Sequence, residues 1–336
     1  MKAIVCQEPF DLTVVDRPAP EPCEGEVLVR IERVGLCGTD YHIFAGRHPF
    51  LSYPRVIGHE LAGKVAAAPA GSRFREGQLV AINPYLSCGT CIGCRKGRPN
   101  ACVHVQVLGV HADGGMCELL AVPERALLDA TGLTPDQAAM LEFLAVGAHA
   151  VARSALTPGS RVLVVGAGPI GIATGLFARL EGAIVTLVDR REARLAYAHN
   201  RLGFADVLAA GEDLIDSLAA RTDGEMFDVV FEATGSIESM SQSLAYLATG
   251  GALVLVGVAP GEIVFSDPEF HKREATLLAS RNALAQDFER VVSAIKAGLI
   301  PTAALQTHSV AAVEMPAHLP ELIGDADHVL KAIAYF

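Results

Sequence analysis

The chain has 336 residues, of which 51% are hydrophobic and 19% are charged, and its formal net charge is −11. This length fits two domains better than one. The negative charge argues against nucleic acid or an anionic membrane as the main partner. No apolar run approaches the roughly 18 residues of a membrane span, and the N-terminus lacks the pattern of a secretion signal. We therefore expect a cytoplasmic protein.

The first 148 residues have the composition of a β-rich domain. Glycine and proline interrupt them repeatedly, and residues 27–31 read as a strand. Residues 133–153 have helical character and begin with Thr134-Pro135-Asp136, a typical helix start. The last residues, 329–336, read as a strand that returns to this first domain.

A strand, a glycine turn and a helix follow one another at 162–180. The turn is Gly166-x-Gly168-x-x-Gly171. The first glycine allows a tight turn, the second allows a pyrophosphate to approach the backbone, and the third allows the helix to pack on the strand. Pro169 and Ile170 open the helix, where free N–H groups would face the pyrophosphate. The motif therefore predicts dinucleotide binding.

An acidic residue ends the next strand, 184–188. The carboxylate of Asp189 can accept hydrogen bonds from the adenosine ribose hydroxyls, and it would repel the 2′-phosphate of NADP. NAD is therefore favoured. Arg190 and Arg191 follow directly and could bind that phosphate, so the cofactor preference stays open. Arg194 is a further candidate cofactor contact. The alternative is a helix-capping aspartate in a protein that binds no nucleotide.

Strands alternate with helices from residue 160 to about residue 279, which is typical of a parallel sheet. Further strands are expected at 227–231 and 252–256. We predict an α/β fold with a doubly wound parallel-sheet (Rossmann) nucleotide domain at 149–284. A β-rich catalytic domain would combine 1–148 with 285–336 and include a zinc lobe at about 85–105.

Four cysteines lie close together in that lobe. Their spacing, with glycines between them, suits a structural zinc ion with four sulfur ligands and no open position. Unrelated buried cysteines and a nucleic-acid-binding zinc ribbon are the alternatives, and the acidic chain argues against the second. The predicted ligands are Cys88, Cys91, Cys94 and Cys102.

A second group, Cys37 with His59 and Glu60, offers ligands for a catalytic zinc ion that keeps a position open for substrate or water. Spacing alone leaves a purely structural histidine as the alternative.

Together these features resemble the zinc-dependent medium-chain alcohol dehydrogenase family, and the resemblance spans essentially the whole chain. Glu142 matches the glutamate ligand of the branch that contains polyol and threonine dehydrogenases. The resemblance implies a GroES-like catalytic domain, two zinc ions per chain and NAD. It also implies a homodimer or homotetramer, with the sheet edge at 275–279 as a candidate interface.

The same resemblance assigns the catalytic zinc ligands to Cys37, His59 and Glu142. Glu60 would lie beside them, either behind the ligands without binding the ion or as a ligand that exchanges with one of them. A quinone reductase of the same superfamily would lack the zinc ligands, and a zinc-ribbon binding module would leave the glycine motif unexplained.

Three residues near the first ligand receive roles from the resemblance. Asp40 would orient the ring of His59, as metal-bound imidazoles usually require. Thr39 would accept the proton of the substrate hydroxyl and pass it toward His42.

Several segments, 35–42, 52–60, 266–272 and 280–283, are most similar to family members that oxidise a sugar acid such as L-galactonate. A carboxylate needs a cation, ideally an arginine. Arg281 beside Asn282 is the first candidate, and Lys272 and His271 are the second. The alternative for each of these residues is a solvated surface charge. The alternative small-molecule substrates are a neutral polyol, such as sorbitol, and the amino alcohol L-threonine.

Overall fold

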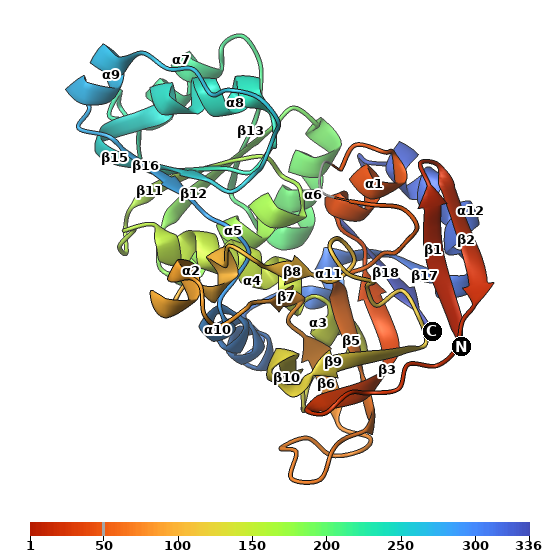
Figure 1. The fold of residues 1–336 in the computed structure, drawn as a ribbon. Coiled ribbons are helices and arrows are strands. Elements are labelled where there is room, and N and C mark those ends of the chain that lie inside the picture. The colour runs from red at the N-terminus through yellow and green to blue at the C-terminus, as the bar shows by residue number, and fades with distance from the viewer. Residues whose placement is uncertain (49–50) are drawn as a thin grey trace. The chain divides into compact units, whose positions relative to one another are not determined.

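The computed structural model describes residues 1–48 and 51–336, which divide into two compact units. The first unit contains Met1–Glu142, Leu284–Gly298 and Leu305–Phe336, and the second contains Phe143–Ala283 and Leu299–Ala304. The boundary near residue 142 lies inside α4 (Leu141–Arg153). Figure 1 follows the chain through both units.

The first unit is built on a mostly antiparallel sheet with the strand order β10-β6-β5-β3-β18-β17, to which β9 adds by pairing with β3. A smaller sheet has the order β2-β1-β4. The elements of this unit are β1 (Lys2–Glu8), β2 (Asp11–Asp16), β3 (Glu26–Gly35), α1 (Gly38–Phe44), β4 (Arg55–Val56), β5 (Glu60–Ala67), β6 (Leu79–Ile82), β7 (Tyr85–Leu86), α2 (Ile92–Arg95), β8 (Gln106–Val107), β9 (Leu119–Pro123), β10 (Leu127–Asp129), α3 (Pro135–Ala139), α10 (Ala285–Lys296), β17 (Gln306–Ala311), α12 (Met315–Gly324) and β18 (Lys331–Tyr335).

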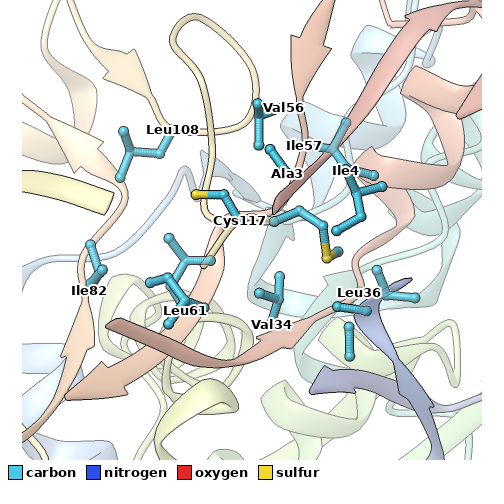
Figure 2. Close-up of a cluster of buried hydrophobic side chains, with 14 of the residues drawn as sticks. Ala3, Ile4, Val34, Leu36, Val56, Ile57, Leu61, Ile82, Leu108 and Cys117 are labelled. Carbon is cyan, nitrogen blue, oxygen red and sulfur yellow. The ribbon is translucent and has the colours of Figure 1, made fainter. Parts of the chain in front are cut away.

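Alternating burial along β3 explains why this segment is a central strand. Val27, Val29 and Ile31 are buried, whereas Arg30 between them is exposed. Figure 2 shows the core that the strands share, in which side chains of the two sheets and of the segment around Cys117 meet. Each fully buried aliphatic side chain of this kind contributes about 1.5–3 kcal/mol.

The second unit is a parallel sheet with the strand order β13-β12-β11-β14-β15-β16. The order reverses between β11 and β14, which is the strand order of a doubly wound sheet. The elements are β11 (Arg161–Val165), α5 (Pro169–Leu180), β12 (Ile184–Asp189), α6 (Glu192–Leu202), β13 (Asp206–Ala209), α7 (Leu214–Arg221), β14 (Phe227–Glu232), α8 (Ile237–Gln242), β15 (Leu247–Leu255), α9 (Asp267–Lys272) and β16 (Thr276–Ala279); α11 (Thr302–Leu305) leads back to the first unit.

The predicted combination of a Rossmann-type parallel sheet and a β-rich unit is confirmed. The helix start at Thr134 is also present, because its hydroxyl accepts the N–H of Gln137 in a capping box. The helical segment divides at Met140 into α3 and α4. Among the described residues, none of the helices combines the length and apolar character that crossing a membrane requires.

Candidate functional site

Cys37, His59 and Glu60 meet at one point of the first unit, where His59 and Glu60 are buried and Cys37 is partly exposed. Their ligand atoms, the Cys37 sulfur, a ring nitrogen of His59 and a carboxylate oxygen of Glu60, lie within 4.8 Å of one another. Cys37 is the N-cap of α1, and Glu60 is the first residue of β5. The structure therefore joins two segments that the sequence singled out separately.

Asp40 fixes the backbone of both ligand segments. Its Oδ2 accepts the N–H of Cys37 at 2.9 Å, and its Oδ1 accepts the N–H of Gly58 at 3.1 Å. The expected hydrogen bond to His59 is not formed, because Oδ1 lies 3.9 Å from Nδ1 of the ring. Asp40 thus positions the loops that hold the ligands, and it acts on the ring through its charge.

Glu60 is paired with a lysine from the last strand. Lys331 Nζ donates to both carboxylate oxygens, at 2.6 and 2.7 Å, and to the carbonyl of Leu36. Burial raises the pKa of Glu60 to about 7, and the charge of Lys331 opposes this rise. The sequence analysis missed Lys331, although a single lysine among aliphatic residues in a predicted strand is the signal that could have found it.

Glu142 lies outside the compact group of three. It is buried near the start of α4, and its Oε1 accepts the hydroxyl of Tyr85. Its charge nevertheless acts on both His59 and Glu60. Tyr85 is a second residue that the sequence analysis missed, since nothing in its surroundings indicates a partner 57 positions away.

The electrostatics at His59 show that the group suits a cation. Burial alone would lower the pKa of the ring, but Cys37, Asp40 and Glu142 raise it well above its usual value. The Nδ1 atom is buried and has no hydrogen-bond partner. Sulfur, imidazole and carboxylate are the ligands that zinc takes in catalytic sites, so these residues fit the metal.

Further histidines surround this point. Burial first, and then the nearby His111, His42 and His59, lower the pKa of His48. Cys37 Sγ lies 3.8 Å from Thr39 Oγ1, and His42 follows Thr39 by three positions on α1, so both can face the same side. The sequence analysis did not single out His111.

The four cysteines of the lobe converge as expected. Their sulfur atoms lie within 4.8 Å of one another, with contacts of 3.5 to 3.7 Å, far beyond the bond length of a disulfide, and all four are free thiols. The backbone N–H groups of Thr90 and Cys91 lower the pKa of Cys88 to about 5, whereas burial raises the pKa of Cys94 to about 11. Four converging sulfur atoms suit a cation that would displace their protons, and Cys₄ is a common zinc ligand set.

The glycine turn of the second unit has the geometry that its spacing predicts. Gly166 has a φ of +107°, and a Cβ at Gly171 would lie 1.8 Å from the carbonyl oxygen of Gly166. A Cβ at Gly168 would meet nothing closer than 3.6 Å, so the space above this residue is open. Pro169 and Ile170 form the first turn of α5, whose N-cap is Gly168.

Asp189 lies at the edge of a cavity of about 550 Å³, lined also by Gly166, Gly168, Arg190 and Arg194. Its Oδ2 accepts the N–H of Ala167 at 2.6 Å, and its Oδ1 accepts the N–H of Arg191 at 2.8 Å. The carboxylate therefore fastens the glycine turn to the end of β12. This cavity contains five of the residues predicted to bind the cofactor.

Glu232 is a buried acid beside the same cavity, at the end of β14. Its Oε1 accepts the N–H and hydroxyl of Thr234 and the hydroxyl of Ser239, whereas its Oε2 has no partner. Its backbone oxygen accepts the N–H of Gly257. One residue thus connects three segments around the cavity.

The candidate substrate residues are not brought together. Arg281 and Asn282 follow β16, at the carboxyl edge of the sheet where the cavity lies. His271 and Lys272 end α9, whose next residue, Arg273, bonds to the opposite end of β15 through Leu247 and Gly250. The two pairs therefore lie at opposite ends of the parallel strands. We keep only Arg281 and Asn282, at the carboxyl ends, as candidates for substrate binding.

Two family models match the chain. The model for the alcohol dehydrogenase GroES-like domain matches residues 23–132, and the model for zinc-binding dehydrogenases matches residues 169–297.

Curated and solved relatives cover nearly the whole chain. L-Galactonate-5-dehydrogenase of Escherichia coli K12 is 41% identical over 92% of this chain and 91% of its own length. A crystal structure of the alcohol dehydrogenase RspB of Escherichia coli CFT073, complexed with NADH, has a TM-score of 0.94 at 30% identity and covers 100% of this chain and 99% of that one. A zinc-binding dehydrogenase of Sinorhizobium meliloti 1021, bound to NADP, has a TM-score of 0.90 at 28% identity, with coverage of 100% and 99%. The chain therefore belongs to the zinc-binding medium-chain alcohol dehydrogenase family and is an oxidoreductase.

Proposed function

We propose that the protein is a zinc-dependent, NAD-linked dehydrogenase that interconverts a secondary alcohol and a ketone on a sugar acid of the L-galactonate type. The observation that supports this most is the convergence of Cys37, His59 and Glu60, with Glu142 close enough to act on His59. The similarity to L-galactonate-5-dehydrogenase supports the substrate class.

The chain's own residues would supply the binding and the proton path. Cys37, His59 and Glu142 would hold the metal, with Glu60 beside them, and Thr39 would take the proton of the substrate hydroxyl toward His42. When bound, zinc would act as a Lewis acid on the alcohol oxygen, and NAD would accept the hydride from the carbon. The four cysteines of the lobe would hold a second, structural zinc ion.

NAD is proposed over NADP because a carboxylate, that of Asp189, stands at the end of β12 in the cavity. An adenosine ribose can donate its hydroxyls to that group, whereas a 2′-phosphate would meet a like charge. Because Arg190 and Arg194 also line the cavity, we expect NADP to be used less efficiently than NAD rather than not at all.

Metal content tests the first part of the proposal. We expect about two zinc ions per chain in the wild type, and one in Cys37→Ser and in Cys94→Ser. Glu262→Gln, which changes an exposed acid in the second unit, serves as a control that keeps both. A single ion in the wild type would contradict the proposed pair of sites.

A substrate screen tests the second part. NAD reduction is measured with L-galactonate, other aldonates, sorbitol, galactitol and L-threonine. We expect the acids to be preferred, and Arg281→Ala to raise KM for acids but not for neutral polyols. Arg201→Ala removes an exposed arginine elsewhere in the second unit and is the matched control. Equal rates on acids and polyols, unchanged in Arg281→Ala, would favour a neutral polyol dehydrogenase.

A further inference from the structure

Tyr85 belongs to a short ladder at the base of the cysteine lobe. Strand β7 pairs antiparallel with β8, with Tyr85 opposite Val107 and Leu86 opposite Gln106. Cys88 follows β7 by two residues, and Cys102 precedes β8 by four. The ladder therefore encloses the segment that contains all four cysteines.

The backbone around Tyr85 is held on both sides. Its N–H donates to Asn83 Oδ1 at 3.0 Å, and the carbonyl of Pro84 accepts the N–H of Leu108 at 3.1 Å. These two bonds fix the backbone next to Tyr85 at the base of the lobe.

The side chain of Tyr85 points to Glu142, the glutamate proposed as a ligand of the catalytic zinc ion. Its hydroxyl donates to Oε1 of Glu142, which is buried near the start of α4. Among the described residues, Tyr85 is the side chain that donates a hydrogen bond to the Glu142 carboxylate. One oxygen of Glu142 is thereby fixed by the phenol.

We propose that Tyr85 is a positioning residue that holds Glu142 for the metal at Cys37 and His59, and that it couples this metal to the one in the cysteine lobe. The inference rests on the proposed function for the presence of both ions. A partner that orients a metal ligand typically changes metal affinity about 10- to 100-fold. Coupling between two sites is reciprocal, so filling either site strengthens the other.

The first experiment measures metal release without substrate. Zinc-loaded wild type, Tyr85→Phe and Tyr197→Phe are mixed with a chromophoric chelator, and Cys37→Ser shows which phase belongs to the lobe. We expect Tyr85→Phe to release the ion at Cys37 and His59 roughly 10- to 100-fold faster. Tyr197 donates to the carbonyl of Ala304 at 2.7 Å within the second unit, so Tyr197→Phe loses a similar bond and should release both ions as the wild type does. Equal release in all three proteins would overturn the proposal.

The second experiment tests the coupling. A Cβ at Gly93 would lie 2.7 Å from the carbonyl oxygen of Ala101, so Gly93→Ala strains the lobe without removing a ligand. We expect this change to accelerate release of the ion at Cys37 and His59 in the wild-type background, but not in the Tyr85→Phe background. Equal acceleration in both backgrounds, or none in the first, would overturn the coupling. Cys88→Ser replaces Gly93→Ala if the latter does not fold.

These outcomes are separable from failure of the proposed function. Inactivity on every alcohol would contradict the proposed reaction but leave the release kinetics as a test of Tyr85. A wild type that contains a single ion would overturn both proposals. Two ions with unchanged release in Tyr85→Phe would overturn this one alone.

Discussion

Lys331 Nζ lies 2.6 and 2.7 Å from the two carboxylate oxygens of Glu60, and the pair is almost completely buried. The lysine comes from β18 and the acid from β5. Because both oxygens are occupied, Glu60 is less available to a metal than its position beside Cys37 and His59 would indicate. The buried pair also makes the candidate metal site depend on strand β18.

Replacing the lysine should destabilise the protein strongly. Lys331→Met leaves the Glu60 carboxylate buried without a counter-charge, and we expect the free energy of unfolding to fall by about 3–5 kcal/mol in urea titrations. Adding Glu60→Gln should restore part of this loss. Lys64→Met, which breaks a partly exposed pair with Glu32, should cost less than about 1 kcal/mol. Similar losses in Lys331→Met and Lys64→Met would show that the buried pair contributes no more to the free energy of unfolding than the Lys64–Glu32 pair does.

Two glycines of the turn should respond differently to alanine. Gly171→Ala places a methyl group 1.8 Å from the carbonyl oxygen of Gly166, so we expect a large loss of thermal stability. Gly168→Ala has room for its methyl group, so this variant should fold normally and yet lose NAD binding, measured by fluorescence titration of NADH. Gly211→Ala, with nothing within 4 Å, is the control. Normal NADH affinity in Gly168→Ala would contradict the assignment of this turn to the pyrophosphate.

The charge of Asp189 should set the cofactor preference. Asp189→Asn keeps the size of the side chain but removes its charge and one of the two oxygens that accept backbone N–H groups. We expect the ratio of kcat/KM for NADP to that for NAD to rise roughly 10- to 100-fold. Asp216→Asn, an exposed change on α7, should leave this ratio unchanged. An unchanged ratio in Asp189→Asn would mean that the arginines around the cavity decide the preference.

Glu232 should make stability depend on pH. Burial raises the pKa of this carboxyl, so the folded state binds its proton more tightly than the unfolded state does. Its stabilising contribution is then present below the unfolded pKa of about 4.3 and is lost as the pH rises through the folded pKa. Glu232→Gln should therefore gain stability relative to the wild type between about pH 4.3 and pH 8. A constant difference across this range in urea titrations would contradict the direction of the shift.

The edge strand β16 should join two copies of the chain. It ends the parallel sheet, and Leu277 is 39% exposed on it. Exposed apolar edge strands commonly pair with another chain. We expect a dimer or tetramer in light scattering, and a smaller species for Leu277→Lys. An unchanged mass in that variant would place the interface elsewhere.

Local chemistry explains what could be predicted from the sequence. Contacts within short segments or adjacent strands determine the arrangement of the glycine turn, Asp189 and the four cysteines. The spacing of these residues in the sequence is therefore enough to predict how they are arranged. The start of α3 at Thr134 follows from a capping box only three residues long.

The remainder depends on partners that are distant in the chain. Lys331 is 271 positions from Glu60, and Tyr85 is 57 positions from Glu142. A local pattern could single out Lys331 as unusual, but it could not identify the partner of either residue. Lys272 resembled Arg281 in charge, but the crossover through α9 puts it at the other end of the parallel strands. Asp40 was expected to orient the ring of His59, whereas its carboxylate accepts hydrogen bonds from the backbone N–H groups of Cys37 and Gly58.

The position of β18 between β3 and β17 has a consequence for biosynthesis. Both neighbours of this strand leave the ribosome before it does, so the nascent sheet has an open slot that exposes the unpaired edge of β3. Until residues 331–335 emerge, the acid next to the metal ligands has no ammonium group to neutralise it. We expect metal loading to follow the addition of β18 to the sheet rather than precede it.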